Sequence, residues 1–174
     1  MFKDVGDFLR YYDGLQKRTI RDVSALPEAA TTYQPPQSEG ERGWPIGEIV
    51  RHIGGARLYF ARAYRNEGWV WDGAREVQSR DDWIPVLEET YAEFKRRIEG
   101  TPPEWLERRI EMIDTDGTLA GWRLLMMCLE HEVHHRSQID TYAGLNGWEP
   151  PQIYGRSAEQ VGAQRERQIQ KHSG

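Results

Sequence analysis

Apolar residues recur at three- and four-residue steps in four long segments of this chain, and this spacing constrains the fold more than any other feature of the sequence. The first segment runs to about Leu26-Pro27, and the residues of its stripe are Phe2, Val5, Leu9, Tyr12, Thr19, Ile20 and Val23. Side chains at these steps share one face of an α-helix, whereas a half-buried strand alternates every second residue. No segment shows a convincing alternation of that kind. The sequence therefore predicts an all-α fold.

Three further segments have the same helical pattern, and connections containing proline and glycine separate them. We expect helices from about Trp44-Pro45 to about Asn66, from about Asp81 to about Gly100, and from about Thr118 to Leu145. Proline suits the first turn of a helix, and glycine or proline suits its end. Four amphipathic helices can bury their apolar faces around one core, so we expect a four-helix bundle. The long connections are compatible with a crossover topology as well as with a simple up-and-down one.

The chain is long enough to form one domain with a substantial core, since it has 174 residues. We expect the bundle to occupy residues 1–155 and a polar C-terminal tail to occupy residues 156–174. Ser157 and Gln160 have the spacing of a capping box, in which each residue satisfies a backbone N–H of the other. The tail is therefore expected to form a short last helix.

Charge and hydropathy narrow the classes of partner. The chain has 23 basic and 28 acidic residues and a net charge of −5, with no long basic run. Because phosphates are neutralised by clustered Lys and Arg, we expect no nucleic-acid partner. No apolar run approaches the roughly 18–20 residues that cross a bilayer, and the first residues lack the apolar run of a signal peptide. We therefore expect no membrane partner and a cytoplasmic location, which the single cysteine also fits.

Three of the five histidines lie within five positions of the expected fourth helix, at His131, His134 and His135. Positions i and i+4 lie about one turn apart on the same helix face, so His131 and His135 can close on a single metal ion. At 100° per residue their stripe also contains Leu124, Met127, Gln138, Tyr142 and Leu145, and we expect it to face the interior. A second apolar face lies nearly opposite and consists of Trp122, Met126, Leu129 and Val133. That face indicates a central helix or a subunit contact.

A metal site needs a third ligand, and His52 on the expected second helix is the best candidate because it flanks an apolar stripe. Three neutral imidazoles and an exchangeable water make an open site of the catalytic type. Glu48, one turn before His52, could be a fourth ligand or an acceptor that orients an imidazole. Gln138 and Tyr142 could line the pocket and bind a substrate through hydrogen bonds.

Simpler interpretations exist for each of these residues. A lone pair of histidines at this spacing often arises by chance, and His52 alone fits a hydrogen-bonded residue at the edge of the core. His134 lies well round from the centre of the pair and fits a surface position or an orienting role. Cys128 could approach a metal as a thiolate, although a small buried core cysteine is the simpler interpretation. His172 near the C-terminus fits a solvated residue.

The run from His131 to His135 also reads His-Glu-x-x-His, which is the zinc-protease signature with Glu132 as the general base. That chemistry needs a third ligand downstream and a cleft between subdomains. The acidic residues that follow, Asp140 and Glu149, have no persuasive position for this role. Together with the all-helical pattern, this argues against a protease.

Three stretches of the chain carry a family resemblance. They are Trp44-Pro45-Ile46-Gly47-Glu48-Ile49-Val50-Arg51-His52, then His131-Glu132-Val133-His134-His135-Arg136-Ser137-Gln138, then Leu145-Asn146-Gly147-Trp148-Glu149-Pro150-Pro151-Gln152-Ile153-Tyr154-Gly155. With them the chain resembles the DinB/YfiT-like superfamily of metal-binding four-helix bundles from about residue 4 to residue 160. Ser137 stands where that family usually has glycine, and Pro45 stands where it commonly has serine or threonine; both residues suit their helical positions.

The resemblance implies an up-down-down-up bundle, often a homodimer, in which the second apolar face of the fourth helix would have a use. It implies that His52, His131 and His135 are the metal ligands and that the metal is zinc or nickel, between which ligand chemistry alone does not choose. Characterised relatives include metal-dependent transferases that act with low-molecular-weight thiols and an isomerase that uses such a thiol. Fold and site transfer more safely than the reaction.

The leading hypothesis is a metal-dependent enzyme in which the three-histidine site activates a thiol or water against a small electrophilic substrate, as a thiol S-transferase does. The same site with water alone would make a small-molecule hydrolase. A rival from another class is a non-catalytic stress-response or binding module that the metal stabilises. A helical dimer without metal is a further alternative, and it predicts histidines too far apart for coordination.

Overall fold

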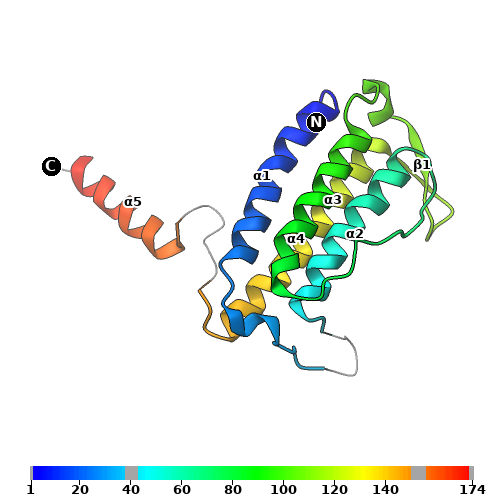
Figure 1. The fold of residues 1–174 in the computed structure, drawn as a ribbon. Helices are drawn as coiled ribbons and strands as arrows, with labels where there is room; N and C mark the ends of the chain where they lie inside the picture. The colour runs from blue at the N-terminus through cyan, green and yellow to red at the C-terminus, as the bar shows by residue number, and fades with distance from the viewer. Residues whose placement is uncertain (1, 38–42, 150–155, 173–174) are drawn as a thin grey trace.

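The structure is a computed structural model that describes residues 2–37, 43–149 and 156–172. Four long helices form a bundle and a fifth follows it (Figure 1). The helices are α1 (Val5–Ser24), α2 (Ile46–Tyr64), α3 (Trp83–Ile98), α4 (Gly121–Leu145) and α5 (Ala158–His172). Three 3₁₀ turns, Glu28–Thr31, Arg80–Asp82 and Pro103–Leu106, and two strands, β1 (Arg109–Glu111) and β2 (Thr118–Ala120), complete the described elements.

Contacts at the ends of the helices define the direction of each. Phe8 near the start of α1 packs against Phe94 near the end of α3, with ring centroids 6.3 Å apart, so these two helices are antiparallel. Arg65, which follows α2, donates to the carbonyl of Arg97 at the end of α3 at 3.0 Å, so α2 and α3 are parallel. In Figure 1, α2 and α3 run the same way, and α1 and α4 run the opposite way. The prediction of an up-down-down-up bundle is confirmed.

A crossover connection joins the parallel helices α2 and α3, and it lies against α2. A Cβ on Gly55 would approach the Trp71 ring to 2.8 Å, and one on Gly54 would approach Thr90 of α3 to 3.1 Å. Hydrogen at these two positions therefore lets α3 approach one side of α2 and the crossover approach the other. The consequence for the site is that Trp71 lies directly beside α2.

Residues 109–120 contain a short hairpin that the pattern of the sequence did not show. There β1 and β2 pair as an antiparallel hairpin with Ile110 opposite Leu119, and α4 begins at Gly121 rather than at Thr118. Strands of three residues are too short to show alternation in the sequence. A Cβ at Gly121 would lie 2.2 Å from the carbonyl oxygen of Trp105, so the chain passes from strand to helix where only glycine fits.

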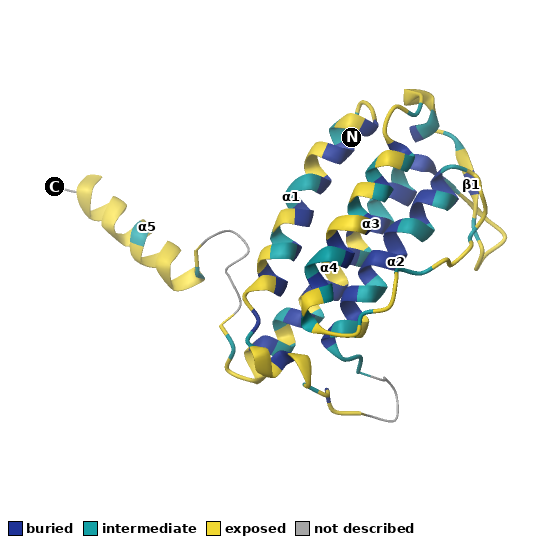
Figure 2. Cartoon of the chain, in the orientation of Figure 1, coloured by how far each residue is buried: buried dark blue, intermediate teal, exposed yellow. Residues whose placement is uncertain are grey.

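The apolar core consists of two clusters with a polar layer between them. Figure 2 shows that the dark-blue buried residues face the inside of the bundle. One cluster includes Phe8, Tyr12, Phe60, Phe94 and Leu124, and the other includes Val23, Ile49, Ile53, Leu87 and Ile139. Between them along the helices lie the buried polar residues Gln16, Thr19, Arg57, Thr90 and Glu132. The middle of the bundle is thus the place where polar chemistry is concentrated.

The interior stripe of α4 differs from the predicted one. Its buried residues are Gly121, Leu124, Leu125, Cys128, Leu129, Glu132, His135, Arg136, Ile139 and Ala143. Leu129, predicted to lie on the opposite face, is buried, whereas Leu145, predicted to be interior, is 72% exposed. The reason is that α4 packs against both α1 and α2, and the face between these neighbours is centred on Glu132 rather than on His131.

The tail forms the predicted last helix, α5. Gln160 N–H donates to Ser157 Oγ at 3.2 Å and Ser157 N–H donates to Gln160 Oε1 at 3.0 Å, so the predicted capping box is present. No described residue of α5 is buried (Figure 2). The predicted domain boundary at residue 155, and the part of the third resembling stretch from Pro150 on, lie outside the described residues. Within the described residues, no helix combines the length and the apolar character that crossing a bilayer requires.

Candidate metal centre

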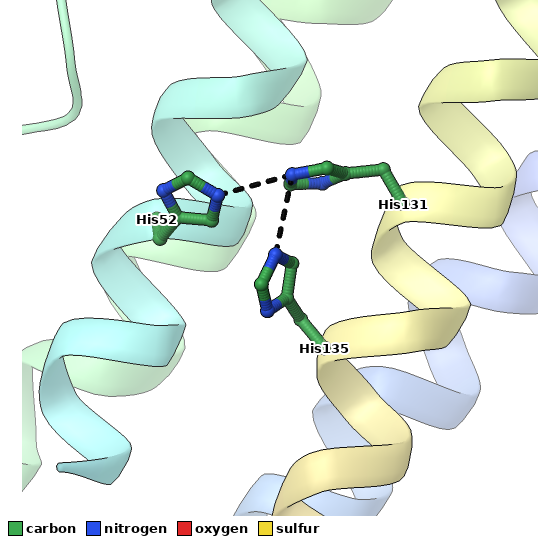
Figure 3. Close-up of side chains that lie close together, drawn as sticks. All are labelled: His52, His131 and His135. Carbon is green, nitrogen blue, oxygen red and sulfur yellow. Dashed lines mark hydrogen bonds between the residues drawn. The ribbon is translucent and has the colours of Figure 1, made fainter. Parts of the chain in front are cut away.

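Three histidine side chains from two helices converge in the polar layer. His52 comes from α2, and His131 and His135 come from α4 (Figure 3). The Nε2 atom of His131 lies 3.0 Å from Nε2 of His52 and 3.2 Å from Nε2 of His135. One nitrogen from each ring lies within 4.8 Å of the others. The structure thus brings together the three residues that the sequence proposed as ligands; the ligand assignment itself stays a prediction.

A buried ion pair beside the histidines determines how α2 and α4 lie against each other. Arg57 of α2 donates from Nε to Glu132 Oε2 at 3.0 Å and from Nη2 to Glu132 Oε1 at 2.8 Å. The side chains of these two residues are 1% and 2% exposed. Arg57 follows His52 by five residues and Glu132 adjoins His131. A rigid bidentate pair at this position therefore also determines the distance from His52 to the two histidines of α4.

The Arg57–Glu132 pair is fully supplied with hydrogen bonds. The Glu132 carboxylate also accepts from Tyr12 at 2.6 Å and from Thr19 at 2.7 Å, both on α1. Arg57 donates further to the Leu87 carbonyl of α3 at 2.6 Å. Burial alone would raise the pKa of Glu132, but the charge of Arg57 and these hydrogen bonds outweigh it and hold the pKa below its usual value. The network contacts all four helices of the bundle.

This network was not predicted from the sequence, where Glu132 was considered only as the base of a zinc protease. Its carboxylate accepts from Arg57, Tyr12 and Thr19, so the protease hypothesis has no support from its position. A signal was present: Glu132 and Arg57 are opposite charges inside apolar stripes of two helices. Charges in such positions are rarely fully buried unless they are paired.

The three imidazoles are electrically neutral at pH 7. Burial, followed by the neighbouring His135, lowers the pKa of His52 to about 4. Burial, followed by His135 and His52, lowers the pKa of His131 to about 3. Burial also lowers the pKa of His135. Since metals bind the neutral imidazole, all three rings are in the state that a metal requires.

Gln138 determines which nitrogen of His135 faces the cluster. The Nδ1 atom of His135 lies 2.7 Å from Gln138 Oε1, an acceptor, so Nδ1 carries the proton and donates it. The lone pair of His135 is therefore on Nε2, which faces His131. This is the arrangement in which an outer residue orients a metal-binding imidazole. Gln138 thus contacts His135 and does not line the pocket beside His52, and its predicted contact with a substrate stays a prediction.

The cluster fits a divalent metal ion. Ligands at 2.0–2.1 Å from a tetrahedral zinc lie about 3.3 Å from one another, close to the two Nε2 separations of 3.0 and 3.2 Å. Three neutral nitrogens from imidazole suit zinc and nickel alike. The cluster in the described residues has three members, and neither Glu48 nor Cys128 is one of them. A tetrahedral ion bound there would keep one position open.

Two tryptophans and a pocket lie beside the histidines. The Trp44 ring lies 4.6 Å from the ring of His52 and stacks on His135 at 5.7 Å, and the Trp71 ring stacks on His52 at 5.2 Å. A pocket of about 310 Å³ is lined by Trp44, Glu48, Arg51, His52 and Trp71, together with Gly73 and Ala74. His52 therefore belongs both to the cluster and to the pocket, which gives a small molecule a route to the histidines.

The remaining candidates lie in different places. Glu48 is exposed and lines the pocket. Tyr142 lies two turns beyond His135 and packs on Tyr33 at 5.3 Å, so it does not line that pocket. His134 is exposed, with its ring 4.9 Å from that of His135.

The two other residues considered as alternatives agree with their simpler interpretations. Cys128 is buried in the core 3.5 Å from the Tyr12 hydroxyl, and burial raises the pKa of its thiol to about 12. It is therefore a protonated thiol at neutral pH. His172 is exposed at the end of α5.

Comparisons with known proteins agree with this fold. The sequence model of the DinB family matches residues 1–168. The uncharacterized protein YjoA of Bacillus subtilis (strain 168) is 28% identical over 113 residues, which cover 64% of this chain and 70% of that protein. The crystal structure of a DinB-like protein from Bacillus cereus ATCC 10987 has a TM-score of 0.70 at 15% identity, over 87% of this chain and 99% of that one. The crystal structure of the DinB-like YjoA from Bacillus subtilis has a TM-score of 0.61 at 20% identity, over 79% and 91% of the two chains.

Proposed function

The chain belongs to the DinB family, and from this premise we propose that it is a metal-dependent enzyme that binds one divalent ion through His52, His131 and His135. One observation carries the proposal. The neutral imidazoles of His52, His131 and His135 direct their Nε2 atoms to one point, and His52 also lines a pocket. A site with three protein ligands and access for a small molecule is the arrangement of catalytic rather than structural metal sites.

The proposed reaction is the transfer of a small thiol to an electrophilic small molecule. A zinc or nickel ion at the site would lower the pKa of a thiol or water that reaches the open position, so that the thiolate or hydroxide is available at neutral pH. Gln138 holds His135 with its lone pair toward the site. Trp44 packs on the rings of His52 and His135, and Trp71 stacks on His52, so two indoles flank the route to the histidines. Glu48 in the pocket wall would contact the substrate, whereas Tyr142 would act only through its neighbours.

A purely structural metal is the rival proposal, and the polar layer argues against it. The bundle already contains a satisfied Arg57–Glu132 network that contacts all four helices, so it has a stabilising centre that needs no metal. A metal that the fold requires is commonly closed off by four protein ligands. We therefore expect the protein to stay folded when a chelator removes the ion, and unfolding on chelation would favour the structural role.

Metal content is the first test. Elemental analysis of the purified protein should give about one zinc or nickel ion per chain, a ratio that follows from the one three-histidine cluster. His52→Ala, His131→Ala and His135→Ala should each lose the ion. His134→Ala is the matched control, because His134 adjoins His135 but is exposed and outside the cluster. Equal metal content in all four variants would sink the proposal.

Activity is the second test, and it separates the two enzymatic alternatives. The metal-loaded protein is offered an aryl halide and a small thiol, and thioether product is measured against the His52→Ala variant. Product that depends on the thiol and on His52 supports the transferase. A small-molecule hydrolase would instead cleave an activated ester with water alone. That result would mean that water, and not a thiol, is the nucleophile at the site.

A homodimer is part of the proposal, and the outer face of α4 supports it. Trp122 and Met126 are partly exposed there and Val133 is 38% exposed. Apolar side chains gathered on one outer face commonly mark a contact surface. Sedimentation analysis should give twice the mass of one chain, and Val133→Glu should shift it to the monomer.

A further inference from the structure

The pocket beside His52 contains a charged group, Arg51, that the proposed reaction does not use. Arg51 and Glu48 lie next to each other on the first turns of α2, and both line the pocket together with the indoles of Trp44 and Trp71. At about 310 Å³ the pocket is at the small end of the range for ligand sites, so it suits a small molecule rather than a peptide. The charged groups in its wall are therefore the features that can select among small molecules.

Arg51 has hydrogen-bond donors available for a ligand. Its Nη2 lies 3.1 Å from Glu76 Oε1, but the Arg51 and Glu76 side chains are 41% and 72% exposed. An ion pair at such exposure contributes little, so a better acceptor can replace it. The Nε of Arg51 is buried and donates to no acceptor among the described residues. The accessible donors are therefore the Nη groups, and a carboxylate that replaces Glu76 can accept two parallel hydrogen bonds from a guanidinium.

We propose that this pocket binds a small carboxylate with a flat or apolar body, with the body between Trp44 and Trp71 and the carboxylate on Arg51. This inference rests on the proposed function, because the other end of the molecule would face His52 and the metal site. A monoanion matches the single positive charge of Arg51.

The two indoles and Glu48 could in principle form a cage for an ammonium group instead, because cations bind to tryptophan faces. The position of Arg51 in the same pocket argues against that ligand. A divalent ion on the adjacent histidines would repel an ammonium further. The pocket therefore favours a carboxylate over an ammonium.

Three probes with one body test the charge preference. Phenylacetate, phenylacetamide and 2-phenylethylamine are titrated into the full-length, metal-loaded protein, and binding is followed by tryptophan fluorescence. Phenylacetate should bind at least about tenfold more tightly than phenylacetamide, in line with the strength of a charge-assisted hydrogen bond. Arg51→Met should remove this preference and Arg51→Lys should retain part of it. Arg62→Met is the matched control, because Arg62 is also on α2 but pairs with Asp72 outside the pocket.

A second variant tests the aromatic walls. Trp71→Ala should weaken all three probes by a similar factor, because Trp71 contacts the body of the molecule and not its charged end. Trp71 is 47% exposed, so its removal leaves the core intact. Unchanged binding of all three probes in this variant would mean that the pocket is not their site, and the inference would be wrong.

The remaining outcomes are distinguishable from failure of the proposed function. If Arg51→Met keeps the preference, the carboxylate binds the metal or another site and the inference fails. If 2-phenylethylamine binds most tightly, the pocket is a cation cage and the inference fails. Metal content is measured on the same samples. If the protein holds metal but shows no preference for phenylacetate that depends on Arg51, the inference alone is wrong. If it shows that preference but holds no metal, the proposed function alone is wrong.

Discussion

His131 and Glu132 are neighbours on α4, yet their side chains belong to two polar clusters of opposite character. The Glu132 carboxylate accepts four hydrogen bonds from Tyr12, Thr19 and Arg57, and its charge is balanced within the fold. The His131 ring faces two other neutral imidazoles, and its Nε2 atom contacts the Nε2 atoms of His52 and His135. One cluster is balanced by protein groups alone, whereas the other consists of three neutral imidazoles whose nitrogens could hold a metal ion. The difference predicts that Glu132 maintains the fold and that the adjacent His131 serves a ligand.

The largest expected effect is loss of the Glu132 carboxylate. Glu132→Ala leaves the Arg57 guanidinium buried without a counter-charge, so the free energy of unfolding should fall by about 3–5 kcal/mol. Urea denaturation followed by circular dichroism measures it. Glu130→Ala is the matched control, because Glu130 is exposed and its pair with Arg123 should be worth less than about 1 kcal/mol. Equal effects of the two variants would erase the distinction between the clusters.

The second effect should appear in metal affinity rather than stability. His131→Ala should weaken metal binding by at least about 100-fold, since loss of a residue outside the coordination sphere already costs 10–100-fold. The unfolding free energy of the metal-free variant should stay near that of the parent protein, because no ion pair is broken. Competition with a chromophoric chelator gives the affinity. A large loss of stability in this variant would show that the histidines, too, maintain the fold.

A smaller effect is expected where a side chain acts on the site through another residue. Gln138→Ala removes the acceptor of the His135 Nδ1 proton, and metal affinity should fall about tenfold. Gln138→Glu should retain affinity, because a carboxylate also accepts that proton. Both variants should unfold at the urea concentration of the parent. If Gln138→Ala binds metal as tightly as the parent, Gln138 does not orient His135.

The smallest effect concerns Asp22, a buried carboxyl group that lacks what Glu132 has. It is 1% exposed, it lies 3.4 Å from Arg136 Nε, and neither of its oxygens accepts a hydrogen bond from the described residues. Burial, followed by the charge of Asp140, raises its pKa from 3.8 to about 6. The folded protein therefore holds a proton that the unfolded chain releases between about pH 4 and pH 6.

The sign for Asp22 is thus opposite to that for Glu132. Stability falls as pH rises through this window, and Asp22→Asn should raise the unfolding free energy at pH 8 by about 1 kcal/mol. The gain should be much smaller at pH 4, where the folded parent keeps the proton and the carboxyl group of the unfolded parent is only about half ionised. Urea denaturation of both proteins at the two pH values measures it. A gain that is the same at pH 4 and pH 8 would contradict the raised pKa.

Much of the fold was predictable because it depends on local spacing. The stripes gave helices close to α1, α2 and α3, and Ser157 and Gln160 form the predicted capping box. The hairpin of β1 and β2 was not predictable, because three-residue strands carry too few residues for a periodic signal. The start of α4 at Gly121 depends on a contact with the backbone of Trp105, and this contact forms only when the chain folds.

The site divides in the same way. That His131 and His135 share a face follows from i, i+4 spacing, and Gln138 next to His135 follows from i, i+3 spacing. The predicted interior stripe of α4 was centred on His131 rather than on Glu132, so the stripe did not include Glu132. A single helix carries no information about which neighbours cover it. Trp71 beside His52 was also missed, since its position depends on the crossover that packs at Gly55.

The sequence by itself determined four amphipathic helices, a pair of histidines on one face of the fourth, and a chain without clustered basic charge. Each of these depends on residues within a few turns of one another, where helix geometry acts regardless of the rest of the molecule. Only the tertiary structure decided that His52 meets the pair and that Arg57 meets Glu132. It also decided that a pocket opens at His52. These contacts join helices far apart in sequence, and their register is set by packing at Gly54 and Gly55 and by one buried ion pair.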